Sequence, residues 1–154
     1  MMKLVKNTAL VGTLFATVVS GAAHAENVEI YLADMLDNKQ NGYCIDIAKG
    51  REEAANPDDG LQGHTCYSPG GALGYDQTFD TDKFADGLLY MTKFEVCTEV
   101  LSSEAGGALG LAECNGSDEQ KFVFSGEGSI TPTSAPDLCF TVVEDTRSGR
   151  SDTN

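Results

Sequence analysis

Two segments of this chain carry the same landmarks in the same order, and this internal repeat limits the possible folds more than any other feature. Each segment opens with one cysteine, reaches a second cysteine and continues with Gln-x-Phe. The opening and second cysteines are Cys44 and Cys66 in the first segment and Cys97 and Cys114 in the second. A third opening cysteine, Cys139, follows Cys97 by 42 residues, and Gln120 follows Gln77 by 43 residues. A period of this length predicts a fold built from structurally similar units.

The residues between these landmarks favour short β-strands. Apolar or alternating runs are separated by Gly, Asn, Asp, Ser and Pro, as in many-stranded β proteins, and helical periodicity is hard to find. The expected strands cover residues 28–32, 43–47, 61–66, 78–81, 88–94, 96–101, 108–114, 121–125, 129–131 and 138–143. The sequence therefore predicts an all-β fold.

The motifs together resemble the ricin B-type lectin family. They are Cys-x-Asp at 44–46, a second cysteine at the end of the next strand, and Gln-x-aromatic at 77–79. The resemblance covers nearly all of residues 26–154 and implies an all-β β-trefoil, in which three such units form a closed barrel capped by hairpins. The family's Gln-x-Trp is Gln-x-Phe twice here, and the chain has no Trp. We therefore expect Phe79 and Phe122 to pack in the core.

The third unit is expected to be incomplete. The second cysteine follows the opening cysteine by 22 residues in the first unit and by 17 in the second. The same spacing would place a partner for Cys139 at positions 156–161, beyond Asn154. The trefoil domain expected over 26–154 is therefore partial, and it leaves one cysteine without a partner.

The resemblance also implies disulfides within the units, Cys44–Cys66 and Cys97–Cys114. In this reading Cys139 stays free.

The resemblance further implies a shallow carbohydrate site in the first unit. In the family an acid of Cys-x-Asp accepts hydrogen bonds from two sugar hydroxyls, and an aromatic residue two positions before the second cysteine stacks on the sugar ring. A residue before the Gln of Gln-x-Trp adds a polar contact. These positions are Asp46, His64 and Asp76 here, and Gln62 is a plausible further contact. The expected partner is a glycan, either of galactose type or with another sugar.

The other units lack this combination. The second unit has Glu99, Ala112 and Glu119 at the matching positions, and Ala112 cannot stack on a sugar. The third has Thr141 in place of the acid. A structural or protein-interaction module that binds no sugar remains the alternative, because fold alone does not determine function.

The N-terminus predicts export. Lys3 and Lys6 precede an uncharged apolar run at 8–20, and Ala23 and Ala25 are the small residues that precede a cleavage site. This order is typical of a secretory signal peptide over residues 1–25, with cleavage after Ala25 and a secreted or periplasmic product. The alternative, a membrane anchor, is disfavoured because the apolar run is short for a bilayer span.

Charge and composition disfavour several other functions. Removing residues 1–25 takes away 2 of the 10 basic residues and none of the 24 acidic ones, which leaves 8 against 24 and a net charge of −16. Such a surface repels nucleic acids and anionic membranes. No metal site or cofactor is expected, since the mature chain keeps one histidine, and residues 80–87 only loosely resemble a calcium loop. No motif selects catalytic residues, so we expect no enzyme; the oligomeric state stays open.

Overall fold

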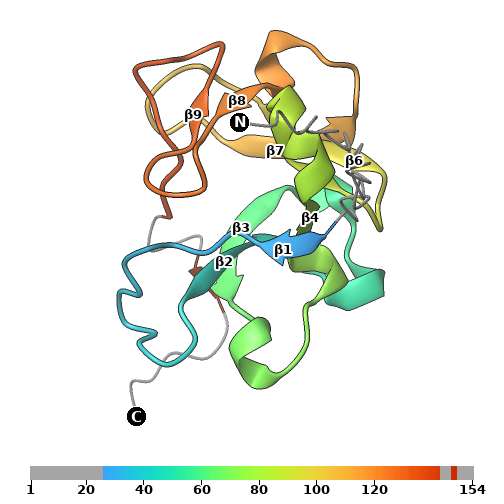
Figure 1. Cartoon of the computed structure of the whole chain (residues 1–154), viewed down its shortest axis with the longest axis vertical. Coiled ribbons are helices and arrows are strands. Elements are labelled where there is room, and N and C mark those ends of the chain that lie inside the picture. The colour runs from blue at the N-terminus through green and yellow to red at the C-terminus, as the bar shows by residue number, and fades with distance from the viewer. Residues whose placement is uncertain (1–25, 143–146, 149–154) are drawn as a thin grey trace, which may run out of the picture.

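The chain forms two lobes, one for each of the repeated units. The computed structural model describes residues 26–142 and 147–148, so the signal peptide predicted over 1–25 lies outside the described residues. Figure 1 shows β1, β2 and β3 in the lower lobe and β6 to β9 in the upper lobe. Strands and short 3-10 helices make up the regular structure, as the all-β prediction requires.

The lower lobe contains the first unit. Strands β2 (Tyr43–Ile47) and β3 (Leu61–Thr65) form an antiparallel hairpin. Strands β1 (Asn27–Glu29) and β4 (Thr78–Asp80) pair antiparallel beside it, although 48 residues separate them along the chain. The unit is thus one hairpin and one strand pair, closed by contacts between its two ends.

The upper lobe repeats this plan. Strands β6 (Val96–Val100) and β7 (Leu109–Glu113) form the second hairpin, and β5 (Tyr90–Met91) pairs with β6. Strand β8 (Phe122–Val123) pairs with β9 (Thr131–Pro132), which closes the second unit before Cys139. The hairpins β2–β3 and β6–β7 therefore stand at the same place in the two units.

Six 3-10 helices connect the described strands. They are η1 (Glu52–Ala54), η2 (Pro57–Asp59), η3 (Ser68–Gly70), η4 (Tyr75–Gln77), η5 (Thr81–Asp86) and η6 (Asp118–Gln120). η4 and η6 each end on the glutamine of Gln-x-Phe, directly before β4 or close before β8. No helix in residues 26–142 is long and apolar enough to cross a membrane.

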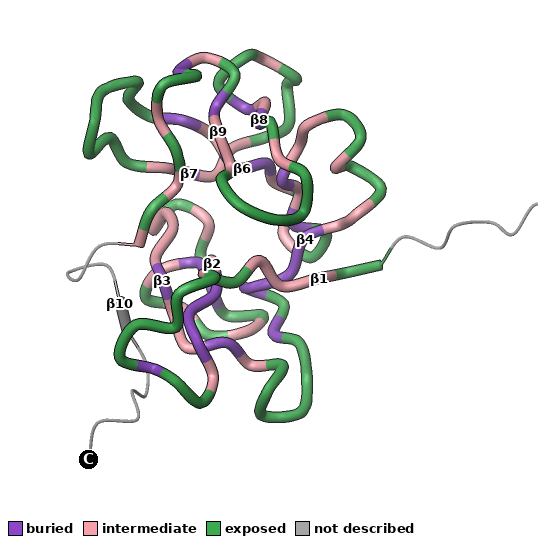
Figure 2. The backbone as a smooth tube through the Cα atoms, turned by 60° about the vertical axis from the view of Figure 1, so that its left-hand side comes forward, coloured by how far each residue is buried: buried purple, intermediate pink, exposed green. Residues whose placement is uncertain are grey.

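The core lies between the two lobes and takes in both phenylalanines of the Gln-x-Phe motifs. Phe79 is fully buried and Phe122 nearly so, which confirms their predicted place in the core. They share one cluster with Ile47, Leu89 and Met91. Figure 2 shows the buried segments running through the middle of the molecule and the exposed loops around its edge.

The third unit contributes less regular structure than its repeat predicts. Residues 138–142 form no strand, although Phe140 packs edge-on against Phe122 with ring centroids 5.1 Å apart. Strand β10 (Arg147–Ser148) instead pairs parallel with β3. Among the described residues the strands form four separate sheets, and no closed trefoil barrel is present.

The segment that resembled a calcium loop is a helix. Residues 81–86 form η5, and the carboxylate of Asp80 accepts a hydrogen bond from the backbone N–H of Asp82 at its start. Asp80 therefore caps a helix here, a role that a short acidic residue commonly has.

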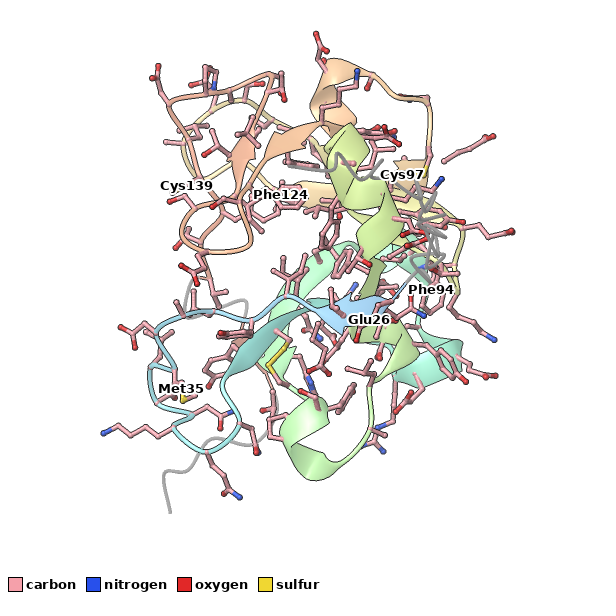
Figure 3. The ribbon with its side chains drawn as sticks, in the orientation of Figure 1. Glu26, Met35, Phe94, Cys97, Phe124 and Cys139 are labelled. Atoms are coloured by element: carbon pink, nitrogen blue, oxygen red, sulfur yellow. A yellow bond between two sulfur atoms is a disulfide. The ribbon has the colours of Figure 1, made fainter. Side chains whose placement is uncertain are left out.

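Two disulfides close the hairpins, and they join the predicted pairs. Cys44 bonds Cys66 and Cys97 bonds Cys114, with Cα atoms 5.0 Å and 5.1 Å apart. Cys139 is free and exposed. Figure 3 places Cys139 and Cys97 on opposite sides of the upper lobe, so these two cannot bond without rearrangement.

We predict that peptide mapping under non-reducing conditions will recover these two pairs and a free Cys139. Each bond closes a loop of about 20 residues and should stabilise the fold by roughly 3 kcal/mol in the chain-entropy model. The double variant Cys97→Ala, Cys114→Ala should lower the free energy of unfolding by that order, measured by urea denaturation. A Cys66–Cys97 peptide would contradict the division into two units.

Candidate functional site

The register of the β2–β3 hairpin gathers three of the predicted site residues on one face. Asp46 lies opposite Gln62, and Cys44 lies opposite His64. Directly opposed residues project to the same face of a sheet, as do residues two apart on one strand. Asp46, Gln62 and His64 therefore share a face with the disulfide sulfur of Cys44.

Gln77 joins this face from η4. Its Nε2 donates to Asp46 Oδ2 at 2.9 Å and to the Thr65 carbonyl at 3.1 Å, while its Oε1 accepts from the Tyr67 N–H at 3.2 Å. The side chain is fully buried. The glutamine amide thus connects the acid of β2 to the chain that follows the second cysteine.

Asp46 is a buried carboxylate held by two amides. Its residue is 1% exposed, and Oδ1 accepts from Gln62 Nε2 at 2.7 Å while Oδ2 accepts from Gln77. Burial raises the pKa of Asp46 from 3.8 to about 6, against the opposite effect of the two amide hydrogen bonds. The nearby charge of Asp76 adds to the increase.

His64 lies against this carboxylate. Its Nδ1 is 3.9 Å from Asp46 Oδ2, 3.2 Å from Gln77 Nε2 and 3.0 Å from the Thr65 carbonyl. Nδ1 donates to that carbonyl when it carries the proton and accepts from Gln77 when it does not. The His64 side chain is 23% exposed, so it is partly buried beside Asp46.

Asp76 lies next to this network but is directed elsewhere. It is fully buried, and its Oδ2 accepts from the backbone N–H of Glu52 at 2.8 Å. Within residues 26–142 its Oδ1 has no hydrogen-bond partner. The structure therefore brings together Asp46, Gln62 and His64, and it places Asp76 under the loop that begins η1.

The second unit has the same frame, which we define as the acid on the first hairpin strand together with the buried glutamine that binds it. The side chains around this frame differ between the two units. Gln120, fully buried on η6, donates to Glu99 Oε2 at 3.1 Å and to the Glu113 carbonyl at 3.0 Å. Glu99 lies opposite Gly110, and Ala112 occupies the place of His64. Glu119, which corresponds to Asp76, is exposed. Of the side chains that meet around Asp46 in the first unit, the second unit therefore keeps only the acid and the glutamine.

Three residues of the site were not singled out from the sequence as contacts. Gln77 could have been, because glutamine recurs at the same place in both units. Tyr67 had no such signal, since Asn115 takes its place after the second cysteine. Glu29 lies far away in the chain, yet its Oε1 accepts from the N–H groups of Tyr67 and Ser68 at 3.2 Å and 3.1 Å.

Glu29 also lies beside the disulfide, but this group is not a metal site. Its carboxylate and the sulfurs of Cys44 and Cys66 lie within 4.8 Å of one another. Metals bind cysteine as the thiolate, and these two sulfurs are bonded to each other. The Glu29 oxygens instead accept backbone hydrogen bonds from the loop after β3.

Comparison with known families supports the resemblance in the second and third units. Residues 85–152 match the ricin-type beta-trefoil lectin domain. No curated protein matches the chain. The matched region starts within η5 and does not include the face around Asp46. A lectin domain indicates carbohydrate binding, and the two disulfides indicate an oxidising compartment.

We predict that Asp46 makes the fold less stable as the pH rises. A carboxyl whose pKa is higher in the folded state contributes stability that is fully present below about pH 3.8 and is lost as the pH rises through about 6. The loss should be about 3 kcal/mol. Urea denaturation at about pH 4 and about pH 7 should show that Asp46→Asn lacks this loss.

Glu99→Gln controls for the removal of one acidic group, because Glu99 occupies the matching position and is less buried. If the wild type and Asp46→Asn respond equally to pH, folding does not raise the pKa of Asp46.

Proposed function

We propose that this chain is an exported carbohydrate-binding β-trefoil of the ricin B-type lectin family, and that it binds a neutral sugar in its first unit. The match to the lectin domain over residues 85–152 supports the family, and the repeated frame extends it to the first unit. A signal peptide over 1–25 with cleavage after Ala25 would deliver it to the periplasm or the outside, where its disulfides form.

One observation carries the choice of site: the first unit keeps the polar and aromatic side chains that the second has lost. In the same register, β3 presents Gln62 and His64 where β7 presents Gly110 and Ala112. Both units keep the acid and the buried glutamine that hold the frame. The side chains that differ are those suited to a ligand, so the first unit is the binding site.

Asp46 is the acceptor for sugar hydroxyls in this proposal. The amides of Gln62 and Gln77 each occupy one position on its two oxygens, and a carboxylate oxygen can accept a further hydrogen bond. Two neighbouring hydroxyls of a pyranose can therefore reach the two oxygens together. The amides set the plane of the carboxylate, so its orientation costs no entropy on binding.

His64 must move for the sugar to enter. Asp46 is 1% exposed, and the His64 ring lies within hydrogen-bonding reach of the residues around it. Rotation of the imidazole towards solvent would uncover the carboxylate and present a flat face to the apolar side of the sugar ring. Gln62 would then contact the sugar from the same strand.

The electrostatics favour a neutral sugar. Asp46, Asp76, Glu29 and Glu52 lie around the site, and the mature chain carries a net charge of −16. Sialylated or sulfated glycans would be repelled, whereas a galactose-type hexose carries no charge. A single shallow site of this kind should bind a monosaccharide with a Kd on the order of millimolar, or about −4 kcal/mol.

We predict that Asp46→Ala will abolish measurable sugar binding, because it removes both hydroxyl acceptors. Saturation-transfer NMR or titration calorimetry with D-galactose and N-acetyl-D-galactosamine gives the measurement. Glu99→Ala is the matched control from the second unit and should bind as the wild type does. Loss of binding in Glu99→Ala but not in Asp46→Ala would place the site in the other unit.

A glycan array with the full-length protein tests the function itself. Signal from neutral galactose-type glycans, and none from their sialylated forms, is the expected result. If no glycan binds, the chain is a structural or protein-interaction trefoil. The deep burial of Asp46 would then explain why no sugar reaches it.

We also predict that sugar affinity falls at acid pH. Hydroxyls donate to the ionised carboxylate of Asp46, whose pKa is about 6. Below that pH the Asp46 carboxyl of the sugar-free protein is protonated, and the affinity for sugar should fall by up to about tenfold per pH unit. Calorimetric titrations between about pH 7.5 and about pH 5 measure this. If the stability measurements confirm that the pKa of Asp46 is raised, an affinity that does not change with pH would show that Asp46 is not the acceptor.

A further inference from the structure

A second aromatic ring stands beside His64. Tyr67 follows the second cysteine of the first unit, and its ring centroid is 5.5 Å from that of His64 with 52° between the planes. Its backbone N–H is fixed by Gln77 Oε1 and Glu29 Oε1, each at 3.2 Å. The position of Tyr67 is therefore set by the same glutamine that orients Asp46.

Gly74 provides the space that this ring occupies. A Cβ at Gly74 would overlap the ring of Tyr67 and would lie 2.8 Å from Asp76 Oδ1. The φ of −86° and ψ of 140° at Gly74 are open to any residue, so its backbone does not require glycine. Because Gly74 has no side chain, the Tyr67 ring and Asp76 Oδ1 both lie in the space that its Cβ would otherwise fill.

The surroundings of Tyr67 keep its phenol neutral. Burial raises the pKa of Tyr67 to about 12, and the charges of Asp76 and Asp46 add to the increase. The phenol therefore stays protonated at physiological pH. Beside acidic neighbours, the ring presents an uncharged face and an O–H donor.

The second unit shows that the ring is not needed for the frame. Asn115 follows the second cysteine there, and its N–H donates to Gln120 Oε1 at 2.8 Å, as that of Tyr67 does to Gln77. The backbone contact is thus kept while the ring is absent. His64 is likewise replaced by Ala112. The two rings are present together in one unit and absent together from the other.

We infer that Tyr67 is a second aromatic contact for the sugar and determines the specificity of the first-unit site. Together with a rotated His64, the Tyr67 ring gives the site a second flat surface beside Asp46, so that the site selects a sugar ring with an apolar C–H face. Hydroxyls on the other edge of that ring reach Asp46. This inference rests on the proposed function of the same site.

The variant Tyr67→Trp would report on the contact directly, because the chain itself has no Trp. The fluorescence emission of the full-length variant should shift or be quenched as D-galactose is added. Val123→Trp, on the exposed surface of β8 in the other lobe, is the control and should show no change. In the wild type, the Tyr67 ring resonances, assigned by comparison with Tyr67→Phe, should move with the same titration.

Two pairs of variants test the ring by affinity. Tyr67→Asn copies the second unit and should weaken galactose binding by roughly three- to tenfold, whereas Tyr67→Phe should stay within about twofold. Gly74→Ala displaces the ring and should weaken binding similarly. Gly70→Ala lies in the same loop with nothing near its added Cβ and should not.

The outcomes separate this inference from the proposed function. Sugar binding that persists while the Tyr67 resonances and the emission of the Tyr67→Trp variant stay constant overturns the role of Tyr67 and leaves the lectin function standing. Wild-type affinity in Tyr67→Asn does the same. If the wild type binds neither galactose nor any glycan of the array, the proposed function and the inference both fail.

Discussion

The hydrogen bonds of one buried glutamine amide hold each unit together. Burying an amide costs free energy unless its donor and acceptor are both paired, and Gln77 and Gln120 are fully buried. Each amide donates to an acid on the first strand of the hairpin and to a carbonyl at the end of the second. Each accepts from the N–H that follows the second cysteine. The hairpin, its disulfide and its acid are therefore set relative to this single group.

Because the frame depends on backbone and amide contacts, the side chains around it can change without loss of the fold. The two hairpins have the same register and the same disulfide, yet one presents Gln62, His64 and Tyr67 and the other presents much smaller or non-aromatic groups. A repeated fold can thus keep one unit for binding while another serves the structure. The longer connection between Cys66 and Gln77 belongs to the first unit and supplies both Tyr67 and Gly74.

In the proposed site, the buried carboxylate of Asp46 would couple sugar binding to stability. Its burial favours the neutral acid, whereas hydroxyl recognition needs the charged form. The two amides that point at its oxygens reduce this conflict but do not remove it. A ligand that brings two hydroxyl donors would stabilise the charge further, so occupancy of the site and ionisation of Asp46 should favour each other.

Local and repeated features were predictable from the sequence: the cysteine pairing, the strand at 43–47 and the burial of Phe79 all follow from motifs that recur at a fixed spacing. Tertiary structure alone decided the rest of the site. The bond between Asp76 and the Glu52 N–H spans 24 residues, and the tilt of Tyr67 against His64 depends on the space at Gly74. Spacing along a chain records which residues share a strand or a turn, but not which loops meet when the units pack.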